Sequence, residues 1–235
     1  MAKGKKLAKA TPDDASSVPQ SADAPSWLHD GHPLPRLIVL DLDYTLWPFY
    51  SDIHISPPIR QVPNSSSLVL ADRNGEQFSL YPDAPHILRL ISSPLLPDTR
   101  LAVASKSPVR DLCREVLKQL RLPPLPPLVL PAPSADGPED PAQAQALAQG
   151  QQQSKRAIDA FDAGLEIYEG TKLRHFEVLA KRTGIPYSEM LFFDDERPNL
   201  EVESLGVTMR LIRDGLTWEE LEKGIMQWRG NQGFV

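Results

Sequence analysis

The chain of 235 residues contains almost no cysteine, no long hydrophobic run and no excess of positive charge. A single cysteine, Cys113, excludes an intramolecular disulfide framework and a cysteine-rich zinc site. No apolar run approaches the roughly 18 residues that a membrane-spanning helix needs, so we expect no membrane partner. The net charge of -6 argues against nucleic acid as a partner. These absences favour an intracellular, reducing compartment, cytoplasmic first and nuclear as the alternative.

Proline is abundant instead, with 24 residues, and it is concentrated in segments without apolar periodicity. Residues 1–35 begin with four lysines among the first ten residues and continue in Ala, Ser, Pro and Asp. Such a segment buries too little apolar surface to offset its ordering entropy, so we predict a disordered basic and polar tail. No apolar stretch follows the basic start, which argues against a signal peptide.

The second such segment is a Pro-rich and then Ala/Gln-rich block, residues 122–154. Because patterned sequence flanks the block on both sides, we interpret it as a low-complexity insertion within one domain, residues 36–235. Arg121, Pro124 and Pro127 have the spacing of an SH3-domain ligand. Such spacing often arises by chance in Pro-rich sequence, so the block predicts at most a weak contact of this kind.

Short apolar runs alternate with amphipathic segments along the rest of the chain. The runs lack in–out alternation, which is typical of strands covered on both faces in a parallel sheet, and they span 37–40, 101–104, 190–193 and 207–212. Helices are predicted for 109–120, 171–182 and 217–228, and Cys113 lies on the apolar face of the first, as an inert buried thiol. The alternation predicts an α/β fold, a three-layer Rossmann-like sandwich with a mainly parallel central sheet.

Polar side chains follow the predicted strands at their carboxyl ends, where such sheets bind ligands. They comprise Asp41 and Asp43, Ser105 and Lys106, Asp194 and Asp195, and Lys172 at the start of a predicted helix. Each alone could be a cap, a turn or a solvated surface residue. Their joint occurrence at successive strand ends favours a functional site. Clustered carboxylates repel unless a cation neutralises them, and oxygen-only ligands favour Mg²⁺.

This set of residues suits the transfer of a phosphoryl group to a carboxylate. An Asp anion about 4 Å from a phosphate dianion meets roughly 8 kcal/mol of repulsion at an effective dielectric constant of about 20, so cations are needed around the phosphoryl oxygens. A carboxylate nucleophile gives an aspartyl-phosphate and divides hydrolysis into two steps. The second carboxyl group can protonate the leaving oxygen and then deprotonate water. These roles require Asp41 to be ionised and Asp43 to be initially protonated.

The motifs are similar to those of the haloacid dehalogenase superfamily, and the longer strings narrow the resemblance to the eukaryotic magnesium-dependent phosphatase-1 family. These strings are 41–48 (DLDYTLWP), 105–107 (SKS), 168–172 (YEGTK) with His175 and Phe176, and 192–196 (FFDDE) with Asn199. The resemblance covers about 36–228 outside the Pro/Gln-rich block. It implies phosphomonoester hydrolysis, on protein phosphotyrosine, on sugar phosphates or on both.

The same resemblance implies a role for each of these residues. Asp41 would be the nucleophile and Asp43 the general acid/base. Mg²⁺ would be bound by the Asp41 carboxylate, the Asp43 main-chain carbonyl and Asp194. Asp195 could instead orient metal-bound water or pair with the lysine, so which adjacent acid ligates directly stays open. The phosphoryl oxygens would be bound by Ser105, Lys106 and Lys172, and the helix that begins near residue 171 could add backbone donors.

A flap, residues 46–81, fills the place where larger relatives carry a cap domain. Its sequence predicts a hairpin that turns at residues 72–75, between the apolar segments 68–70 and 78–80. Such a flap is too short to enclose a large chamber, so we expect an open site for a phosphorylated protein or a small phosphate ester. Trp47, Phe49 and Tyr50 could stack on a substrate ring, but we expect them to pack under the flap. We expect His54 to belong to the flap and His175 to be partly exposed on its helix.

Other classes of protein share part of this pattern. A receiver-like phospho-accepting domain also combines clustered Asp, Ser or Thr and Lys, but it benefits from a long-lived acyl phosphate, against which Asp43 argues. A non-catalytic scaffold that binds partners through the Pro-rich block is a second alternative, and the intact strand-end set disfavours it. A nucleotide-sugar transferase also uses Asp-x-Asp, but it leaves Ser105 and Lys172 unexplained.

Overall fold

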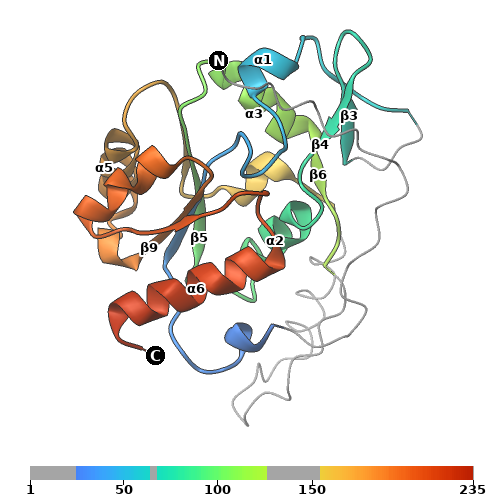
Figure 1. The fold of residues 1–235 in the computed structure, drawn as a ribbon. Coiled ribbons are helices and arrows are strands. Elements are labelled where there is room, and N and C mark those ends of the chain that lie inside the picture. The colour runs from blue at the N-terminus through green and yellow to red at the C-terminus, as the bar shows by residue number, and fades with distance from the viewer. Residues whose placement is uncertain (1–24, 64–67, 126–153, 235) are drawn as a thin grey trace.

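A computed structural model describes residues 25–63, 68–125 and 154–234. The basic start of the predicted tail and most of the Pro/Gln-rich insertion, with Pro127 of the SH3-like pattern, lie outside the described residues. The described part forms a sheet with helices on both faces and a small flap at one end (Figure 1).

The central sheet has five strands, all parallel, in the order β10-β9-β1-β5-β8. The strands are β1 (Leu37–Leu40), β5 (Arg100–Ser105), β8 (Gly164–Ile167), β9 (Met190–Asp194) and β10 (Thr208–Leu211). β1 lies between β5 and β9, and Ile38 pairs with Leu101 on one side and with Leu191 on the other. The predicted α/β sandwich with a mainly parallel sheet is therefore confirmed.

Two hydrophobic clusters, one on each face of the sheet, form the core. Ile38 and Leu40 belong to the cluster beneath α2 (Ala84–Ile91), α3 (Arg110–Gln119) and α6 (Trp218–Gln232). Leu37 and Val39 belong to the cluster beneath α5 (Lys172–Thr183) and the 3₁₀ segment η4 (Arg197–Leu205). All four side chains of β1 are buried. Burial on both faces explains why β1 reads as a continuous apolar run.

Local signals in the sequence set the ends of the long helices. Thr171 caps α5 by accepting a hydrogen bond from the Arg174 backbone N–H, and Thr217 caps α6 in the same way. α5 ends at Gly184 in the left-handed region, with φ of 70°. These helices match the predicted ones, although α6 continues past the predicted end at 228.

The flap consists of a short helix and a three-stranded antiparallel sheet. Its elements are α1 (Ser51–His54), β2 (Arg60–Gln61), β3 (Val69–Ala71) and β4 (Gln77–Ser79). The buried Asp72 side chain accepts hydrogen bonds from the backbone N–H groups of Ser56, Asn74 and Glu76, which stabilises the turn. The predicted hairpin is therefore confirmed.

The described ends of the insertion are ordered. β6 (Arg121–Leu122) pairs antiparallel with β7 (Lys155–Arg156), and η2 (Ala157–Ala160) follows. Leu122, which the sequence analysis assigned to the insertion, is therefore a strand residue with a fully buried side chain. The two strands form a neck from which the insertion departs.

The last part of the predicted tail also packs against the domain. Trp27 in η1 (Ser26–Leu28) is buried, and the fully buried Arg229 of α6 forms an ion pair with Asp30. The Arg229 guanidinium also donates to the main-chain carbonyls of Trp27, His32 and Pro33. From residue 25 onward the expectation of disorder is therefore corrected: one buried guanidinium supplies enough hydrogen bonds to order this segment.

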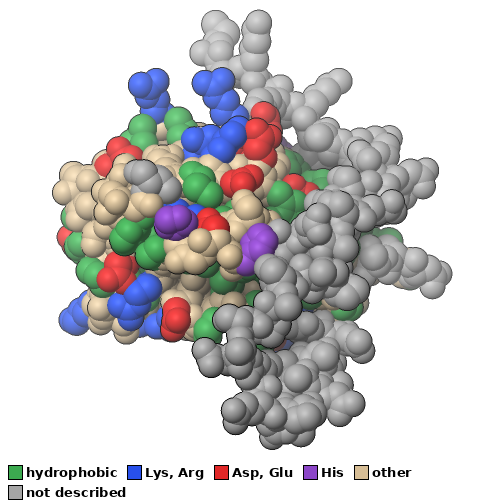
Figure 2. Space-filling model, turned by 90° about the horizontal axis from the view of Figure 1, so that it is seen from below, with side chains coloured by type: hydrophobic (Ala, Val, Ile, Leu, Met, Phe, Trp, Pro, Cys, Tyr) green, Lys and Arg blue, Asp and Glu red, His purple; other side chains and the backbone are tan. Residues whose placement is uncertain are grey.

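On the face in Figure 2, the described residues show no continuous field of one charge. That face carries acidic and basic side chains interspersed with polar ones. Within the described ranges, no helix is both long and apolar enough to cross a membrane.

Candidate active site

The predicted site residues meet at the carboxyl edge of the sheet. Asp41 directly follows β1, while Ser105 and Asp194 end β5 and β9, the two neighbours of β1. The Asp41 backbone N–H donates to the Phe193 carbonyl at 3.0 Å, so the end of β1 is fixed beside the end of β9. Because the strands are parallel, three segments far apart in the sequence deliver their polar residues to one place.

Lys172, the first residue of α5, links two of these strand ends. Its Nζ lies 2.7 Å from Asp41 Oδ1 and 2.9 Å from Asp194 Oδ2, and it also donates to the Ala104 carbonyl of β5. The lysine is 1% exposed, and the Asp194 side chain is fully buried. Burial alone would lower the pKa of Lys172, but the two carboxylates outweigh it and raise that pKa. The lysine is therefore a buried cation.

The site contains more acid than this one lysine can neutralise. Burial raises the pKa of Asp41 to about 7, with Lys172 opposing the shift and the Asp194 charge adding to it. Burial and the Asp194 charge likewise raise the pKa of Asp195 to about 7. Carboxylates that resist ionisation in this way indicate a place where a further cation is favoured.

The donor set fits a magnesium ion that keeps several water ligands. Among the described residues, no group of three or more His, Cys, Asp or Glu side chains is arranged to hold a metal by side chains alone. Magnesium commonly uses one or two carboxylates together with water, so this finding does not conflict with a magnesium site. Asp41 and Asp194 supply two hard oxygen donors around Lys172.

Asn199 of η4 orients Asp194. The Asn199 amide nitrogen lies 2.9 and 2.8 Å from the two Asp194 carboxylate oxygens, and the Glu196 backbone N–H donates to Asp194 Oδ1 at 2.7 Å. Lys106 in turn donates to the Asn199 side-chain carbonyl, which places this predicted phosphate-binding residue at the border of the cluster. Asp195, by contrast, is partly exposed. Asp194 is therefore the acid that points into the cluster and contacts Lys172.

Three donors hold the Asp43 carboxylate in place. The Trp47 indole Nε1 donates to Oδ1 at 2.7 Å, and the Ser51 backbone N–H and hydroxyl both lie 3.2 Å from Oδ2. Burial raises the pKa of Asp43, while the bonds from Trp47 and Ser51 act to lower it. Trp47 and Phe49 are buried, as predicted, whereas the exposed Tyr50 does not fit the expectation that it packs under the flap. The contacts of Trp47 and Ser51 with Asp43 were not predicted from the sequence. Contacts between a loop and a short helix leave no periodic signal in the sequence.

His175 lies behind Ser105 and is fully buried, so the expectation of a partly exposed position was wrong. Its Nε2 lies 3.1 Å from the carbonyl oxygens of both Ser105 and Tyr168, and its Nδ1 lies 2.8 Å from the Thr171 carbonyl oxygen. The ring also stacks on Tyr168 with centroids 4.2 Å apart. His175 therefore connects the ends of β5 and β8 with the start of α5. The amphipathic pattern could not reveal this, because the contacts are to main-chain atoms.

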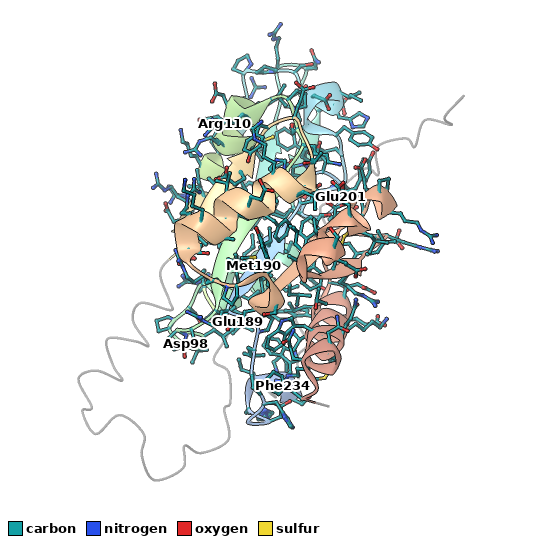
Figure 3. The ribbon with its side chains drawn as sticks, turned by 90° about the vertical axis from the view of Figure 1, so that its left-hand side faces the viewer. Asp98, Arg110, Glu189, Met190, Glu201 and Phe234 are labelled. Atoms are coloured by element: carbon teal, nitrogen blue, oxygen red, sulfur yellow. The ribbon has the colours of Figure 1, made fainter. Side chains whose placement is uncertain are left out.

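One backbone donor at the start of α5 is already engaged. The Lys172 backbone N–H donates to the Glu201 carboxylate at 3.1 Å, and Figure 3 shows Glu201 beside the start of α5. We expected the start of this helix to offer backbone N–H donors to a phosphate. The Lys172 N–H is not available for that purpose while it binds Glu201.

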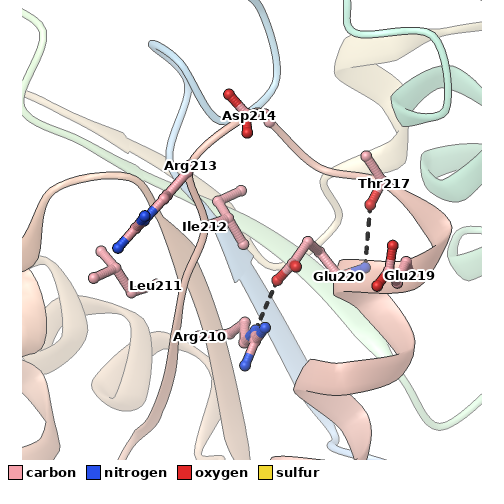
Figure 4. A pocket seen from close by; sticks show the side chains of 9 residues that line it. Arg210, Leu211, Ile212, Arg213, Asp214, Thr217, Glu219 and Glu220 are labelled. Atoms are coloured by element: carbon pink, nitrogen blue, oxygen red, sulfur yellow. Dashed lines mark hydrogen bonds and ion pairs between the residues drawn. The ribbon is translucent and has the colours of Figure 1, made fainter.

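A separate pocket of about 400 Å³ opens beyond β10 (Figure 4), and none of the predicted site residues lines it. Its charges are already paired in part, since Arg210 Nε lies 2.7 Å from a Glu220 carboxylate oxygen. The Glu220 backbone N–H donates to the Thr217 hydroxyl that caps α6. The acidic cluster around Lys172 therefore lies outside this pocket. Its buried carboxylates and lysine make it the better candidate for the active site.

A parallel α/β sheet whose strand ends carry Asp41-x-Asp43, Ser105 and Asp194 around a buried lysine defines a phosphatase of the haloacid dehalogenase type. A family model described as acid phosphatase matches residues 33–231, nearly all of the described domain. Human Magnesium-dependent phosphatase 1 is 34% identical over 193 residues, which cover 82% of this chain and 86% of the relative. The chain belongs to this magnesium-dependent phosphatase family.

Two further similarities are more distant. A HAD-like hydrolase superfamily protein of Schizosaccharomyces pombe is 32% identical over 174 residues, covering 74% of this chain and 83% of that protein. A crystal structure of the N-terminal part of a Bacteroides fragilis protein, which contains a phosphatase domain complexed with Mg, aligns with a TM-score of 0.42 at 13% identity. That alignment covers 86% of this chain and 40% of the other chain, and the score is too low to support any inference about this site.

We predict that Lys172→Met destabilises the metal-free protein strongly. The substitution keeps most of the side-chain volume but leaves Asp41 and Asp194 buried without their cation, a change that typically costs about 3–5 kcal/mol. Urea unfolding in the presence of a chelator measures the loss in the free energy of unfolding.

Lys106→Met is the matched control for this prediction. Lys106 is only partly buried and bonds to an uncharged amide, so the same chemical change should cost about 1 kcal/mol or less. Equal losses in the free energy of unfolding of the two variants would show that Lys172 does not stabilise the two buried carboxylates.

Proposed function

We propose that this chain is a magnesium-dependent phosphomonoesterase that works through an aspartyl-phosphate on Asp41. The observation that carries the proposal is the Lys172 ammonium, buried between Asp41 and Asp194 at distances of 2.7 and 2.9 Å. A structural ion pair needs only one partner for a lysine, whereas phosphoryl transfer to a carboxylate needs cations beside the nucleophile. The family of the chain supports the same chemistry.

In the first step an Asp41 carboxylate oxygen attacks phosphorus and the bond to the ester oxygen breaks. Lys172 keeps the Asp41 side chain in one orientation through its bond to Oδ1. Asp43 donates its proton to the departing ester oxygen, which leaves as an alcohol or phenol. The burial that raises the pKa of Asp43 favours the protonated form needed for this step.

In the second step water attacks the same phosphorus atom and releases inorganic phosphate. Asp43, now ionised, accepts a proton from that water, and the Asp41–phosphorus bond breaks to restore the free carboxylate. The hydroxyl of Ser105, which is 1% exposed at the end of β5, and the Lys172 ammonium contact the phosphoryl oxygens. Lys106, beside Asn199, is the third phosphate-binding group of the proposal.

Magnesium would be bound by the Asp41 carboxylate, the Asp43 main-chain carbonyl and Asp194. When bound, it supplies positive charge that offsets the repulsion between the carboxylates and the phosphate. Asn199 and the Glu196 backbone N–H fix the Asp194 carboxylate for this task. The name of the human relative, a magnesium-dependent phosphatase, supports this choice of ion.

The substrates we propose are protein phosphotyrosine and sugar phosphates. The described part of the flap is a four-residue helix and a small three-stranded sheet, and this small size supports a site that takes a phosphate on a protein surface. Tyr50 is 41% exposed and Ile53 is 68% exposed on this flap, so part of its surface is apolar. Neither feature restricts the site to one size of substrate.

Asp41→Asn should reduce the turnover of an aryl phosphate to below about a thousandth of the wild-type value, because the amide cannot form the covalent intermediate. Acid-quenched wild-type protein should carry a phosphoryl group that this variant lacks. Asp98→Asn, the same change at an exposed loop position (Figure 3), is the control and should leave turnover unchanged. Residual activity of the Asp41 variant near one tenth would refute the nucleophile assignment.

Removal of magnesium with a chelator should abolish turnover, and added Mg²⁺ should restore it, because the carboxylate cluster then regains its compensating cation. The measurement is the steady-state rate during a titration with free Mg²⁺. Asp195→Asn should retain magnesium activation, while Asp194→Asn should lose it. Full activity in the presence of chelator would contradict the role of the metal.

The open site should hydrolyse both a phosphotyrosine peptide and a small sugar phosphate, with values of kcat/KM within about a hundredfold of each other, a difference of about 2.7 kcal/mol. The assay compares phosphotyrosine peptides, sugar phosphates and phosphates of glycated amines at saturating Mg²⁺. Turnover of only one of these classes would show that the flap selects substrates more strongly than its size suggests.

A further inference from the structure

The flap contributes two groups, Trp47 and Ser51, that contact the Asp43 carboxylate. We infer that they are positioning residues, which fix this carboxyl group for proton transfer to the leaving oxygen. The inference rests on the acid/base role proposed above for Asp43. It assigns to the flap a part in the first chemical step, in addition to its place at the border of the site.

The contacts engage both oxygens of the carboxyl group. Oδ1 accepts from the Trp47 indole N–H at 2.7 Å, and Oδ2 accepts from the Ser51 backbone N–H and hydroxyl at 3.2 Å each. A carboxyl group bonded on both oxygens from two different residues cannot rotate without breaking at least one of these bonds. Its orientation is therefore set by the flap.

Packing immobilises the Trp47 ring. The side chain is fully buried and stacks on Phe49 with centroids 5.4 Å apart and ring planes within 5°. The backbone also turns back at this point, since the Tyr44 N–H donates to the Trp47 carbonyl at 2.8 Å and Tyr44 has a φ of 55°. A buried, stacked indole is a rigid donor, which is the property that a positioning group needs.

Ser51 connects this arrangement to the phosphate-binding strand end. Its hydroxyl lies 2.7 Å from the Ser107 hydroxyl, and the Ser107 backbone N–H donates to the Ser105 hydroxyl at 3.2 Å. Ser51 and Ser107 are both buried, and the Cys113 thiol lies 3.3 and 3.4 Å from their hydroxyl oxygens. A continuous chain of hydrogen bonds thus fixes the acid/base and the phosphate-binding hydroxyl in one frame.

The consequence of this arrangement depends on the leaving group. An alkoxide or an unactivated phenoxide must be protonated as it departs, whereas dinitrophenolate leaves without help. General acid catalysis contributes about 10²–10⁴-fold, and it requires the acid within hydrogen-bonding distance of the departing oxygen. A displaced Asp43 carboxyl group should therefore lower kcat/KM for substrates with poor leaving groups and spare kcat/KM for substrates with good ones, because kcat/KM does not include the later hydrolysis of the aspartyl-phosphate.

The test is Trp47→Phe, which keeps an aromatic ring against Phe49 and removes the indole donor. We expect kcat/KM for phenyl phosphate to fall at least about tenfold, and kcat/KM for 2,4-dinitrophenyl phosphate to fall less than about threefold. The inhibition constant of inorganic phosphate should stay within about twofold, because Ser105 and Lys172 are untouched. Ser51→Ala should act in the same direction, and Ser51→Thr, which retains a hydroxyl, should restore the wild-type ratio of the two substrates.

The matched control is Trp228→Phe. The Trp228 indole is buried in α6 and donates to the Ser188 carbonyl at 2.8 Å, away from the site residues. This variant loses an equivalent hydrogen bond and should keep the wild-type ratio between the two substrates. A purely structural effect of Trp47→Phe would lower kcat/KM for both substrates by the same factor. That outcome would overturn the inference.

Asp43→Asn separates this inference from the proposed function. If Asp43 is the general acid, Asp43→Asn alone lowers kcat/KM for phenyl phosphate selectively, since kcat/KM covers the steps up to departure of the leaving group and not the later hydrolysis in which Asp43 also acts. Adding Trp47→Phe then produces little further loss in kcat/KM, because both changes act on one group. An Asp43→Asn variant with no dependence on the leaving group refutes the acid role itself. Suppose that Asp43→Asn lowers kcat/KM for phenyl phosphate selectively, whereas Trp47→Phe lowers kcat/KM for both substrates equally. This result refutes only the positioning role of Trp47.

Discussion

Two carboxylates buried at one edge of a sheet repel each other, and the structure of this phosphatase depends on the single ammonium group placed between them. Lys172 is the first residue of its helix and contacts the ends of β1, β5 and β9 at once. An ion at this position is stabilising only because its partners satisfy it on several sides. The same contacts that fix the three strand ends also leave an excess of negative charge. Stability and chemistry therefore depend on one charge balance.

Around this centre, each functional side chain is held by a partner from a different element. Asn199 of η4 orients Asp194, His175 of α5 binds the carbonyl of Ser105, and Glu201 occupies the first donor of α5. The supporting bonds come mainly from the helices and the flap, whereas three of the proposed site residues, Asp41, Ser105 and Asp194, come from the strand ends. This division explains why a short flap suffices: the sheet already brings the reactive groups together, and preorganisation requires only that they be kept from rotating.

Much of the fold and most of the predicted site could be read from the sequence, because strands covered on both faces are continuously apolar and because parallel strands end at one edge. β8 escaped prediction, since Gly164–Ile167 is short and carries a Glu whose charge is paired with Arg182. The burial of His175 and the contacts of Ser51 could not be predicted, because main-chain carbonyls and single hydroxyls leave no pattern. The order of the segment from residue 25 depends on Arg229, about 200 positions away in the sequence.

The β6–β7 neck has a consequence for the tolerance of this chain to changes in length. Its two strands pair on either side of the Pro/Gln-rich block, outside the central sheet. The two ends of the block are therefore held at fixed positions whatever its length. By the general scaling of loop closure, doubling the number of residues between two fixed ends costs only about 0.6 kcal/mol. A change in the number of residues between β6 and β7 should therefore have a small effect on the free energy of unfolding, as long as the two strands stay paired.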